Sequence, residues 1–265
     1  MPRLGIGIGL SKFGGIAYDA AAVTLFSRMT TAPSAARKLL ISNLIKGLKA
    51  DGIWSLLDLF YITASHDSQS SLLNWISTSF NCTAVNSPAF VADRGYTSNG
   101  TTSYLDTSWI PATHAINYQQ NNASLGVYSR TDINGTLRDI GCLNGTLNMH
   151  MMARTSGNYN LILNANSSAN KTVANSLGFF SGTRVDSSNF KHWQNGVELQ
   201  NNAVASTGLV TVRSLFICAL NSGGSPLNPS TRQIAFAFAG AGSISQLNLF
   251  NRIETYMDAI GAGVV

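Results

Sequence analysis

Two groups of aromatic residues with polar neighbours are the strongest candidates for contact with a ligand. In the first group, Trp193 lies close to Lys191 and Glu198 in the sequence. Sugar-binding sites commonly combine an aromatic surface with a few polar side chains that hydrogen-bond to hydroxyl groups. The pattern therefore predicts that a sugar ring stacks on Trp193, with Lys191 and Glu198 beside it. The alternative is that Trp193 packs against the helices at the start of the chain or against another subunit.

The second group consists of Trp109, His114 and Tyr118. It offers similar chemistry, because its rings can stack on a sugar and its imidazole can donate or accept a hydrogen bond. We treat it as a second candidate sugar site. Packing against the helices at the start of the chain or against another subunit is again the alternative.

Catalytic residues for hydrolysis of a glycosidic bond are not found in a familiar arrangement. Glycoside hydrolases use two carboxyl groups that flank the scissile bond. This chain has two glutamates, Glu198 and Glu254, and neither has an acidic residue two or three positions away. No Gly-x-Ser-x-Gly nucleophile motif occurs, and no two histidines have the i, i+4 spacing of a zinc site. The sequence favours a non-enzymatic protein, with a polysaccharide-degrading enzyme such as a capsule depolymerase as the alternative.

Calcium is the only cofactor for which the sequence offers candidate ligands. Calcium binds carboxylate and carbonyl oxygens, and four aspartates lie at the ends of predicted strands: Asp93, Asp106, Asp132 and Asp139. No two of them form a spaced Asp-x-Asp loop. The alternative is that they are solvated acids in turns, and no other metal or cofactor is expected.

The first aromatic group lies within a predicted β-hairpin over residues 188–201. Asn195-Gly196 suits a two-residue turn, because both central positions of such a turn have positive φ. Pairing across the turn places Trp193 opposite Glu198 and His192 opposite Leu199. Alternation of side chains then predicts a buried face and an outward face that carries Lys191, Trp193 and Glu198. The predicted buried residues are Phe190, His192, Val197 and Leu199.

The rest of the chain beyond residue 80 is typical of a β-sandwich. Short runs of strand-forming residues alternate with turn signals, which is the pattern of antiparallel sandwiches. A closing helix is predicted over 243–260, because its apolar residues recur at helical spacing. The predicted strands lie near 83–86, 89–93, 103–107, 122–130, 136–142, 146–154, 158–164, 171–180, 189–194, 197–201, 208–220 and 231–239.

The first 80 residues are predicted to be mainly helical after an extended arm. Residues 1–15 include alternating glycines and branched apolar residues, which predicts an extended arm; a frayed terminus is the alternative. Residues 16–80 predict a helical section for anchoring and oligomerisation, followed by the sandwich over 81–265. One predicted helix begins at Asp19, and three more span residues 35–50, 53–59 and 68–76. The stretch FYITAS (60–65), between the last two, is predicted to be extended.

Four stretches of sequence resemble phage and prophage virion proteins that carry a laminin-G-like domain. FVADRGYTSNGTTSYLDTSW (90–109) is similar to their F-x-A-x-x-G-Y-x-x-x-G-x-x-S-Y-[LI]-D-T signature, and QNNASLGVYSRTD (120–132) to the strand that follows it. The stretch 235–262, which includes the closing helix, and the segment GLKADGIWSLLDLFYITASHDSQSSLLNW (47–75) also resemble parts of these proteins. The Asn-Gly-Val hairpin is similar to one in laminin-G-like and pentraxin-like sandwiches. The resemblance implies a concanavalin A-like jelly roll.

The resemblance also implies a function and a location. It suggests a structural protein of a tail, baseplate or head decoration that displays a lectin-like sandwich for attachment to a host-surface glycan; a purely architectural domain is the alternative. We expect partners among other virion proteins and other copies of the chain. The bases are scattered, which argues against nucleic acid. Neither a signal peptide nor a membrane span is predicted, so we expect synthesis in a bacterial cytoplasm and assembly into the virion.

Overall fold

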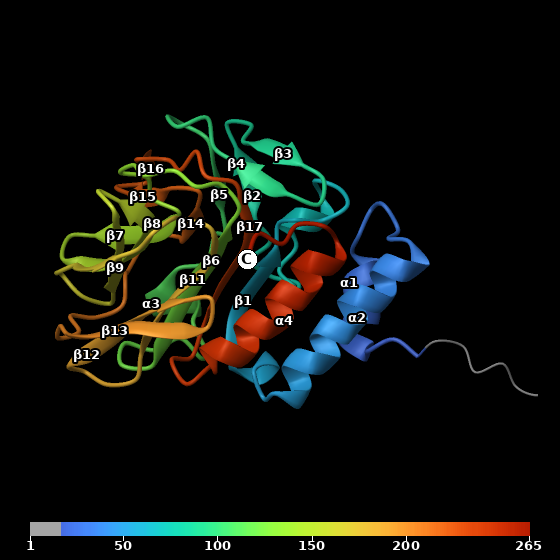
Figure 1. Ribbon diagram of the computed structural model, residues 1–265, viewed down its shortest axis with the longest axis horizontal. Helices are drawn as coiled ribbons and strands as arrows, with labels where there is room; N and C mark the ends of the chain where they lie inside the picture. The colour runs from blue at the N-terminus through green and yellow to red at the C-terminus, as the bar shows by residue number, and fades with distance from the viewer. Residues whose placement is uncertain (1–16) are drawn as a thin grey trace, which may run out of the picture.

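The computed structural model describes residues 17–265, so the predicted arm at residues 1–15 lies outside the described part of the chain. Its architecture is an antiparallel β-sandwich of two sheets, with helices packed against the outer face of one sheet (Figure 1). The fold class predicted from the sequence is therefore confirmed.

The first sheet, sheet A, carries the predicted hairpin at one edge. Its strand order is β13-β12-β11-β6-β17-β4-β3, and β1 also pairs with β17. Its strands are β1 (Leu57–Ile62), β3 (Ala89–Val91), β4 (Gly95–Thr97), β6 (Ala123–Ser129), β11 (Gly178–Arg184), β12 (Asn189–Gln194), β13 (Val197–Ala203) and β17 (Ile234–Gly240).

The second sheet, sheet B, lies across the core from sheet A. Its order is β10-β9-β8-β7-β14-β5-β2, and β15 pairs with β16 and, in parallel, with β7. Its strands are β2 (Thr83–Val85), β5 (Tyr104–Asp106), β7 (Ile140–Asn144), β8 (Leu147–Thr155), β9 (Asn158–Leu163), β10 (Ala169–Thr172), β14 (Phe216–Ile217), β15 (Leu220–Ser222) and β16 (Ser225–Leu227).

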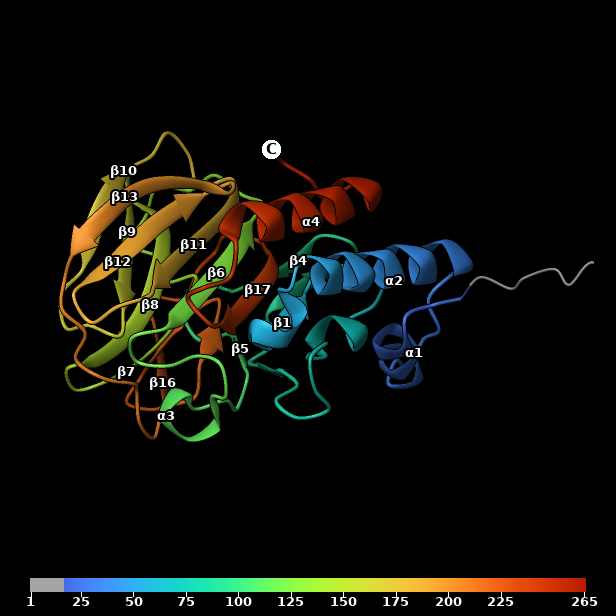
Figure 2. The ribbon, with the colours of Figure 1, turned by 90° about the horizontal axis from the view of Figure 1, so that it is seen from below.

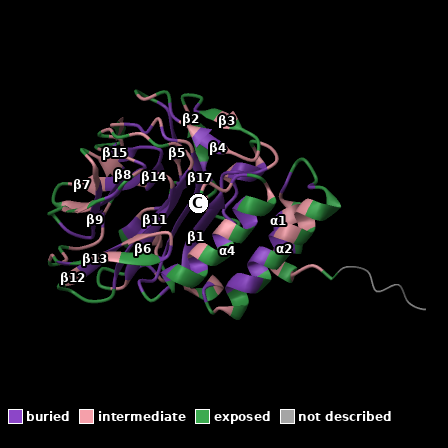
Figure 3. Ribbon diagram, viewed as in Figure 1, coloured by how far each residue is buried: buried purple, intermediate pink, exposed green. Residues whose placement is uncertain are grey.

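A second apolar core lies between sheet A and the helices. These are α1 (Ala20–Ser27), α2 (Ala35–Ala50) and α4 (Gln246–Ala259); α3 (Pro111–His114) is a single turn elsewhere. Helices α2 and α4 lie side by side across the β1–β17 part of the sheet (Figures 1 and 2). The buried strands beneath them are seen in Figure 3. Every second residue of these strands joins the helix-side core, while the residues between them join the core of the sandwich.

The helices begin and end for the reasons expected from the sequence. Helix α2 spans residues 35–50 as predicted; the Ser34 hydroxyl accepts a hydrogen bond from the Arg37 amide, and Gly52 follows the helix with φ of 71°. Asp19 caps α1 in the same way. Helix α4 is shorter than predicted, because Ser245 is its N-cap.

The front section that is expected to be helical, residues 16–80, also contains a strand. The segment expected to be a helix at 53–59 is a short 3-10 turn (Trp54–Leu56) followed by strand β1. Strand β1 pairs antiparallel with β17, so the front section contributes a strand to sheet A. The expected helix at 68–76 is likewise only a 3-10 turn, Ser70–Leu72. The helices and the sandwich are therefore joined through one continuous sheet.

Several strand predictions also need correction. The strand expected over 171–180 is two strands, β10 and β11, which lie in different sheets. In the stretch 208–220, regular pairing begins only at β14. Strands β4 and β16 were not predicted. No helix in the described range 17–265 has the length and apolarity needed to cross a membrane.

Candidate functional site

The predicted hairpin exists, and its turn has the expected geometry. Asn195 and Gly196 both have positive φ, at 50° and 76°. Trp193 pairs with Glu198 as predicted, but a β-bulge follows, so His192 lies opposite Gln200 instead of Leu199. The predicted burial is right for Phe190 and His192. It is wrong for Val197, which is 60% exposed because it lies beside the turn at the sheet edge.

Trp193 lies on the helix-side face of sheet A, where the helices no longer cover it. A groove of about 330 Å³ opens there between the hairpin and the start of α4. We call it the hairpin groove. It is lined by Thr183, Val185, Lys191 and Trp193 on the strands and by residues 242–247 on the opposite wall. Two residues of the predicted first group, Trp193 and Lys191, therefore line a shared groove.

The orientation of the Trp193 ring is held by its neighbours. Its indole N–H donates a hydrogen bond to the Thr183 hydroxyl at 2.8 Å, and the Lys191 ammonium lies 5.9 Å from the ring centre. Lys191 in turn forms an ion pair with Glu198 at 2.8 Å. Glu198 does not line the groove, but it balances the charge of Lys191. The ring is therefore fixed in place while it remains only half-buried.

The opposite wall is rigid because the hairpin turn packs directly on α4. A Cβ atom placed on Gly196 would lie 2.9 Å from the Leu247 Cα, so no side chain fits there. On this wall, Gln246 is only 3% exposed. Its amide nitrogen donates to the Ile244 carbonyl, while its carbonyl oxygen has no partner within residues 17–265. The wall thus holds an unused hydrogen-bond acceptor.

The second predicted group does not form an exposed platform. Trp109 is 1% exposed and Tyr118 is 0% exposed; their rings meet edge to face at 5.6 Å in the core of the sandwich. The Tyr118 hydroxyl donates to the Asn164 side chain. Both rings are therefore part of the sandwich core, and neither the sugar platform nor packing against the front helices is observed for them. Only His114 of this group is half-exposed.

A second groove nevertheless lies beside His114 and Trp109. It has a volume of about 290 Å³ and lies where the front section meets the sandwich, so we call it the junction groove. Asp58, on β1, lies in its wall and accepts hydrogen bonds from the backbone amides of Asn117 and Tyr118, the shorter at 2.7 Å. The lining residues are Trp54, Ser55, Leu57, Asp58, Ile76, Ser77, Phe80, Trp109, His114, Ile116 and Asn117.

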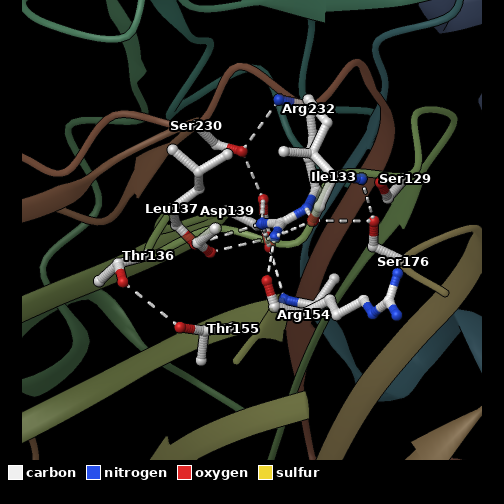
Figure 4. A network of polar contacts seen from close by, with 12 residues as sticks. Ser129, Ile133, Thr136, Leu137, Asp139, Arg154, Thr155, Ser176, Ser230 and Arg232 are labelled. Carbon is white, nitrogen blue, oxygen red and sulfur yellow. Dashed lines mark hydrogen bonds and ion pairs between the residues drawn. The ribbon is translucent and has the colours of Figure 1, made fainter. Parts of the chain in front are cut away.

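One calcium candidate, Asp139, is fully buried and paired with Arg232 (Figure 4). The Arg232 guanidinium donates to both carboxylate oxygens at 3.0 Å. The Ser230 hydroxyl and the Ala153 amide donate to the same carboxylate. Arg232 also donates to the Ile133, Gly135, Leu137 and Arg154 carbonyls and so holds the 133–137 loop. The Arg232 guanidinium occupies the place where a calcium ion would contact the carboxylate. Asp139 therefore stabilises the fold rather than binding calcium.

The other calcium candidates also have partners of their own. Asp93 pairs with Arg37 at 2.7 Å, Asp132 pairs with Arg154 and accepts from the Ser176 amide, and Asp106 accepts from the Ser108 amide. Within residues 17–265, no three His, Cys, Asp or Glu side chains come together in a way that could hold a metal ion.

The two glutamates lie in different environments. Glu198 is exposed on β13, whereas Glu254 is half-buried on α4 beside Tyr128. Burial raises the pKa of Glu254 above its usual value. Neither glutamate lines the hairpin groove or the junction groove. The junction groove is lined by a single acidic residue, Asp58, and the hairpin groove by none, so neither presents the pair of carboxyl groups that glycosidic hydrolysis uses.

Comparisons with known proteins place the fold among solved β-rich structures. No protein-family model and no curated protein matches the chain. A Trypanosoma rangeli sialidase in complex with sialic acid superimposes with a TM-score of 0.54 at 13% identity, over 86% of this chain and 40% of the sialidase chain. The chain thus spans about two fifths of the sialidase.

Two further structures are similar over most of this chain. Domain 4 of AbnA, a GH43 extracellular arabinanase from Geobacillus stearothermophilus in complex with arabinotriose, gives a TM-score of 0.52 at 14% identity, over 74% of this chain and 98% of that domain. The binding domain of botulinum neurotoxin serotype D gives a TM-score of 0.51 at 10% identity, over 78% of this chain and 53% of that chain. At these identities the likeness establishes the fold alone.

Proposed function

We propose that the protein is a non-enzymatic, carbohydrate-binding component of a phage virion and that the hairpin groove holds the sugar. The observation that carries this proposal is the half-buried Trp193 ring, which Thr183 fixes in an open groove on the uncovered part of sheet A. An aromatic ring held in one orientation offers a sugar an apolar surface without an ordering cost on binding.

The polar groups of the groove suit the hydroxyl groups of a sugar. The Gln246 carbonyl oxygen is an unused acceptor, and the hydroxyls of Ser243 and Ser245 lie on the same wall. Lys191 can donate to a sugar oxygen while Glu198 balances its charge. The volume of the groove, about 330 Å³, is close to the lower end of the range for small-molecule sites and suits one or two sugar units.

The comparisons support the same class of ligand. The arabinanase domain and the sialidase are proteins whose structures contain a saccharide, and the arabinanase domain is matched over nearly its whole length. The virion part of the proposal rests on the sequence resemblance. In this proposal, the helices anchor the protein to other virion proteins or to other copies of itself, and the sandwich faces the host surface.

The direct test is binding of purified protein to a glycan array and to host cells, with Trp193→Ala compared against Val197→Ala. Both changes lie on the same hairpin, but Val197 does not line the groove. The proposal predicts that Trp193→Ala greatly weakens binding of the host glycan, whereas Val197→Ala leaves it unchanged. Equal binding by both variants would contradict the proposed site and favour a purely architectural domain.

Two further measurements test the remaining parts of the proposal. Incubation with host capsule should release no oligosaccharide; released oligosaccharide would identify a depolymerase instead. Light scattering and particle assembly should show a homo-oligomer or incorporation into virions. A protein that stays monomeric and is not found in particles would contradict the virion role while leaving sugar binding to be judged by the array.

A further inference from the structure

We propose that the junction groove is a second ligand site and that it recognises an acetamido group, the N-acetyl substituent of an amino sugar. The inference rests on the proposed carbohydrate-binding function, because it specifies which sugars the protein prefers. It concerns a different groove, so the two proposals can fail separately.

The first argument is the hydrogen-bond chemistry of His114. The Ile110 amide donates a hydrogen bond to His114 Nδ1 at 2.9 Å. A neutral imidazole that accepts at Nδ1 carries its proton on Nε2, which is then a donor. No acceptor for this Nε2 proton is found within residues 17–265, and His114 lines the groove half-exposed. The groove therefore offers an N–H group to a ligand.

A second N–H group without an acceptor belongs to Trp109. Its side chain is almost fully buried and lines the groove, and its indole nitrogen has no hydrogen-bond partner in the described part of the chain. A buried donor without an acceptor is costly, so a ligand that supplies an acceptor is favoured. Both N–H groups would be satisfied by a ligand that brings a hydrogen-bond acceptor.

The charge of the groove favours a neutral acceptor over a carboxylate. Asp58 accepts hydrogen bonds from the Ile116, Asn117 and Tyr118 amides, but it forms no ion pair with a basic side chain of residues 17–265. Its negative charge would repel an anionic group beside it. An amide carbonyl has no charge and therefore fits better.

The apolar part of the groove accounts for the methyl group of the acetamido substituent. Phe80 packs on His114 with ring centres 4.7 Å apart, and Trp54 lies in the same lining. Ile116 is 81% exposed, which leaves an apolar side chain at the groove without a partner. A methyl group next to a carbonyl gains from contact with such surfaces, whereas a sugar hydroxyl would lose its water there.

The test compares two disaccharide probes, N,N′-diacetylchitobiose and cellobiose, which differ in the acetamido groups. Saturation-transfer NMR and calorimetry are run on the full chain and on three variants. Ser55→Trp blocks the groove from an exposed position, and Thr113→Trp places the same bulk at an exposed position outside the lining. Trp193→Ala removes the aromatic ring of the hairpin groove.

The proposal predicts that the acetylated probe binds at least roughly tenfold more tightly than cellobiose, with the strongest saturation at the acetyl methyl. Ser55→Trp should abolish the preference, whereas Thr113→Trp and Trp193→Ala should retain it. Trp109→Phe, which removes the indole N–H, should weaken binding while the melting temperature reports any loss of folding. Equal binding of both probes, or a preference that survives Ser55→Trp, would overturn the inference. If Trp193→Ala still greatly weakens host-glycan binding in that case, the proposed function stands without it.

Discussion

The helix-side face of sheet A consists of two halves that differ in what covers them. Under α2 and α4, the strands present Phe60, Phe236 and Phe238, whose rings pack on one another at 4.9 to 5.7 Å and are sealed from water. Beyond the start of α4, the same face presents Thr183, Lys191 and Trp193 and stays open. One sheet thus supplies a packed core on one side and a candidate binding surface on the other, and the difference lies in where the helices end.

The largest effect should follow from a change in the covered half. Phe236→Ala should lower the free energy of unfolding by about 3–5 kcal/mol, because it leaves a cavity among aromatic rings that cannot close around it. Chemical denaturation measures this loss. A loss below about 1 kcal/mol would mean that the helices do not pack on the sheet as described.

The buried side of the hairpin should respond to acid. Burial lowers the pKa of His192 to about 4, from its usual 6.5. The folded protein therefore keeps this imidazole neutral while the unfolded chain binds a proton below pH 6.5, so stability falls as the pH falls through this range. The expected loss from His192 is about 2 kcal/mol between pH 7 and pH 5.

His150 reinforces this effect on sheet B, because burial and then Arg138 lower its pKa to about 3. His192→Leu isolates the contribution of the hairpin. Denaturation curves at pH 7 and pH 5 should show a smaller pH dependence for this variant than for the wild type. An unchanged pH dependence would indicate that His192 titrates in contact with water.

A change in the open half should cost less stability. Trp193→Ala removes a half-buried ring and one hydrogen bond, so we expect a loss of about 1–2 kcal/mol, well below that of Phe236→Ala. The two variants are compared by denaturation in the same buffer. Equal losses would mean that Trp193 belongs to the core and would contradict its assignment to a binding surface.

The smallest effect concerns the ion pair beside Trp193. Lys191 and Glu198 are both about one third exposed, and such pairs contribute about 0–1 kcal/mol. Glu198→Gln should therefore leave the melting temperature nearly unchanged. It should, however, increase the salt dependence of binding to an acidic glycan, because it leaves the Lys191 charge unbalanced.

The sequence predicts local features well where one residue type decides them. The 35–50 helix and the Asn195-Gly196 turn were both predicted, because capping residues and positive φ act over a few positions. Residues 57–59 of strand β1 fall in a predicted helix, since a short apolar run does not distinguish a helix from a strand. The bulge between Glu198 and Gln200 and the exposure of Val197 depend on the edge of the sheet, which the sequence does not mark.

The candidate sites were predicted only in part, for a similar reason. Trp193 and Lys191 were found because alternation along one strand places them outward. Gln246 was not found, because it joins the groove only when α4 folds back on the hairpin. The Arg232–Asp139 pair joins residues 93 positions apart, and no local pattern predicts it. For Trp109 and Tyr118 the sequence leaves a surface site and packing both open, because aromatic composition alone does not indicate burial.

The most direct test of the central claim is a two-dimensional ¹H–¹⁵N spectrum of the four tryptophan indole N–H groups, recorded while a glycan identified by the array is added. The account predicts that the Trp193 signal shifts with the added glycan, while that of Trp75, which lines neither groove, stays in place. A saturable shift at Trp75 with no change at Trp193 would contradict the account.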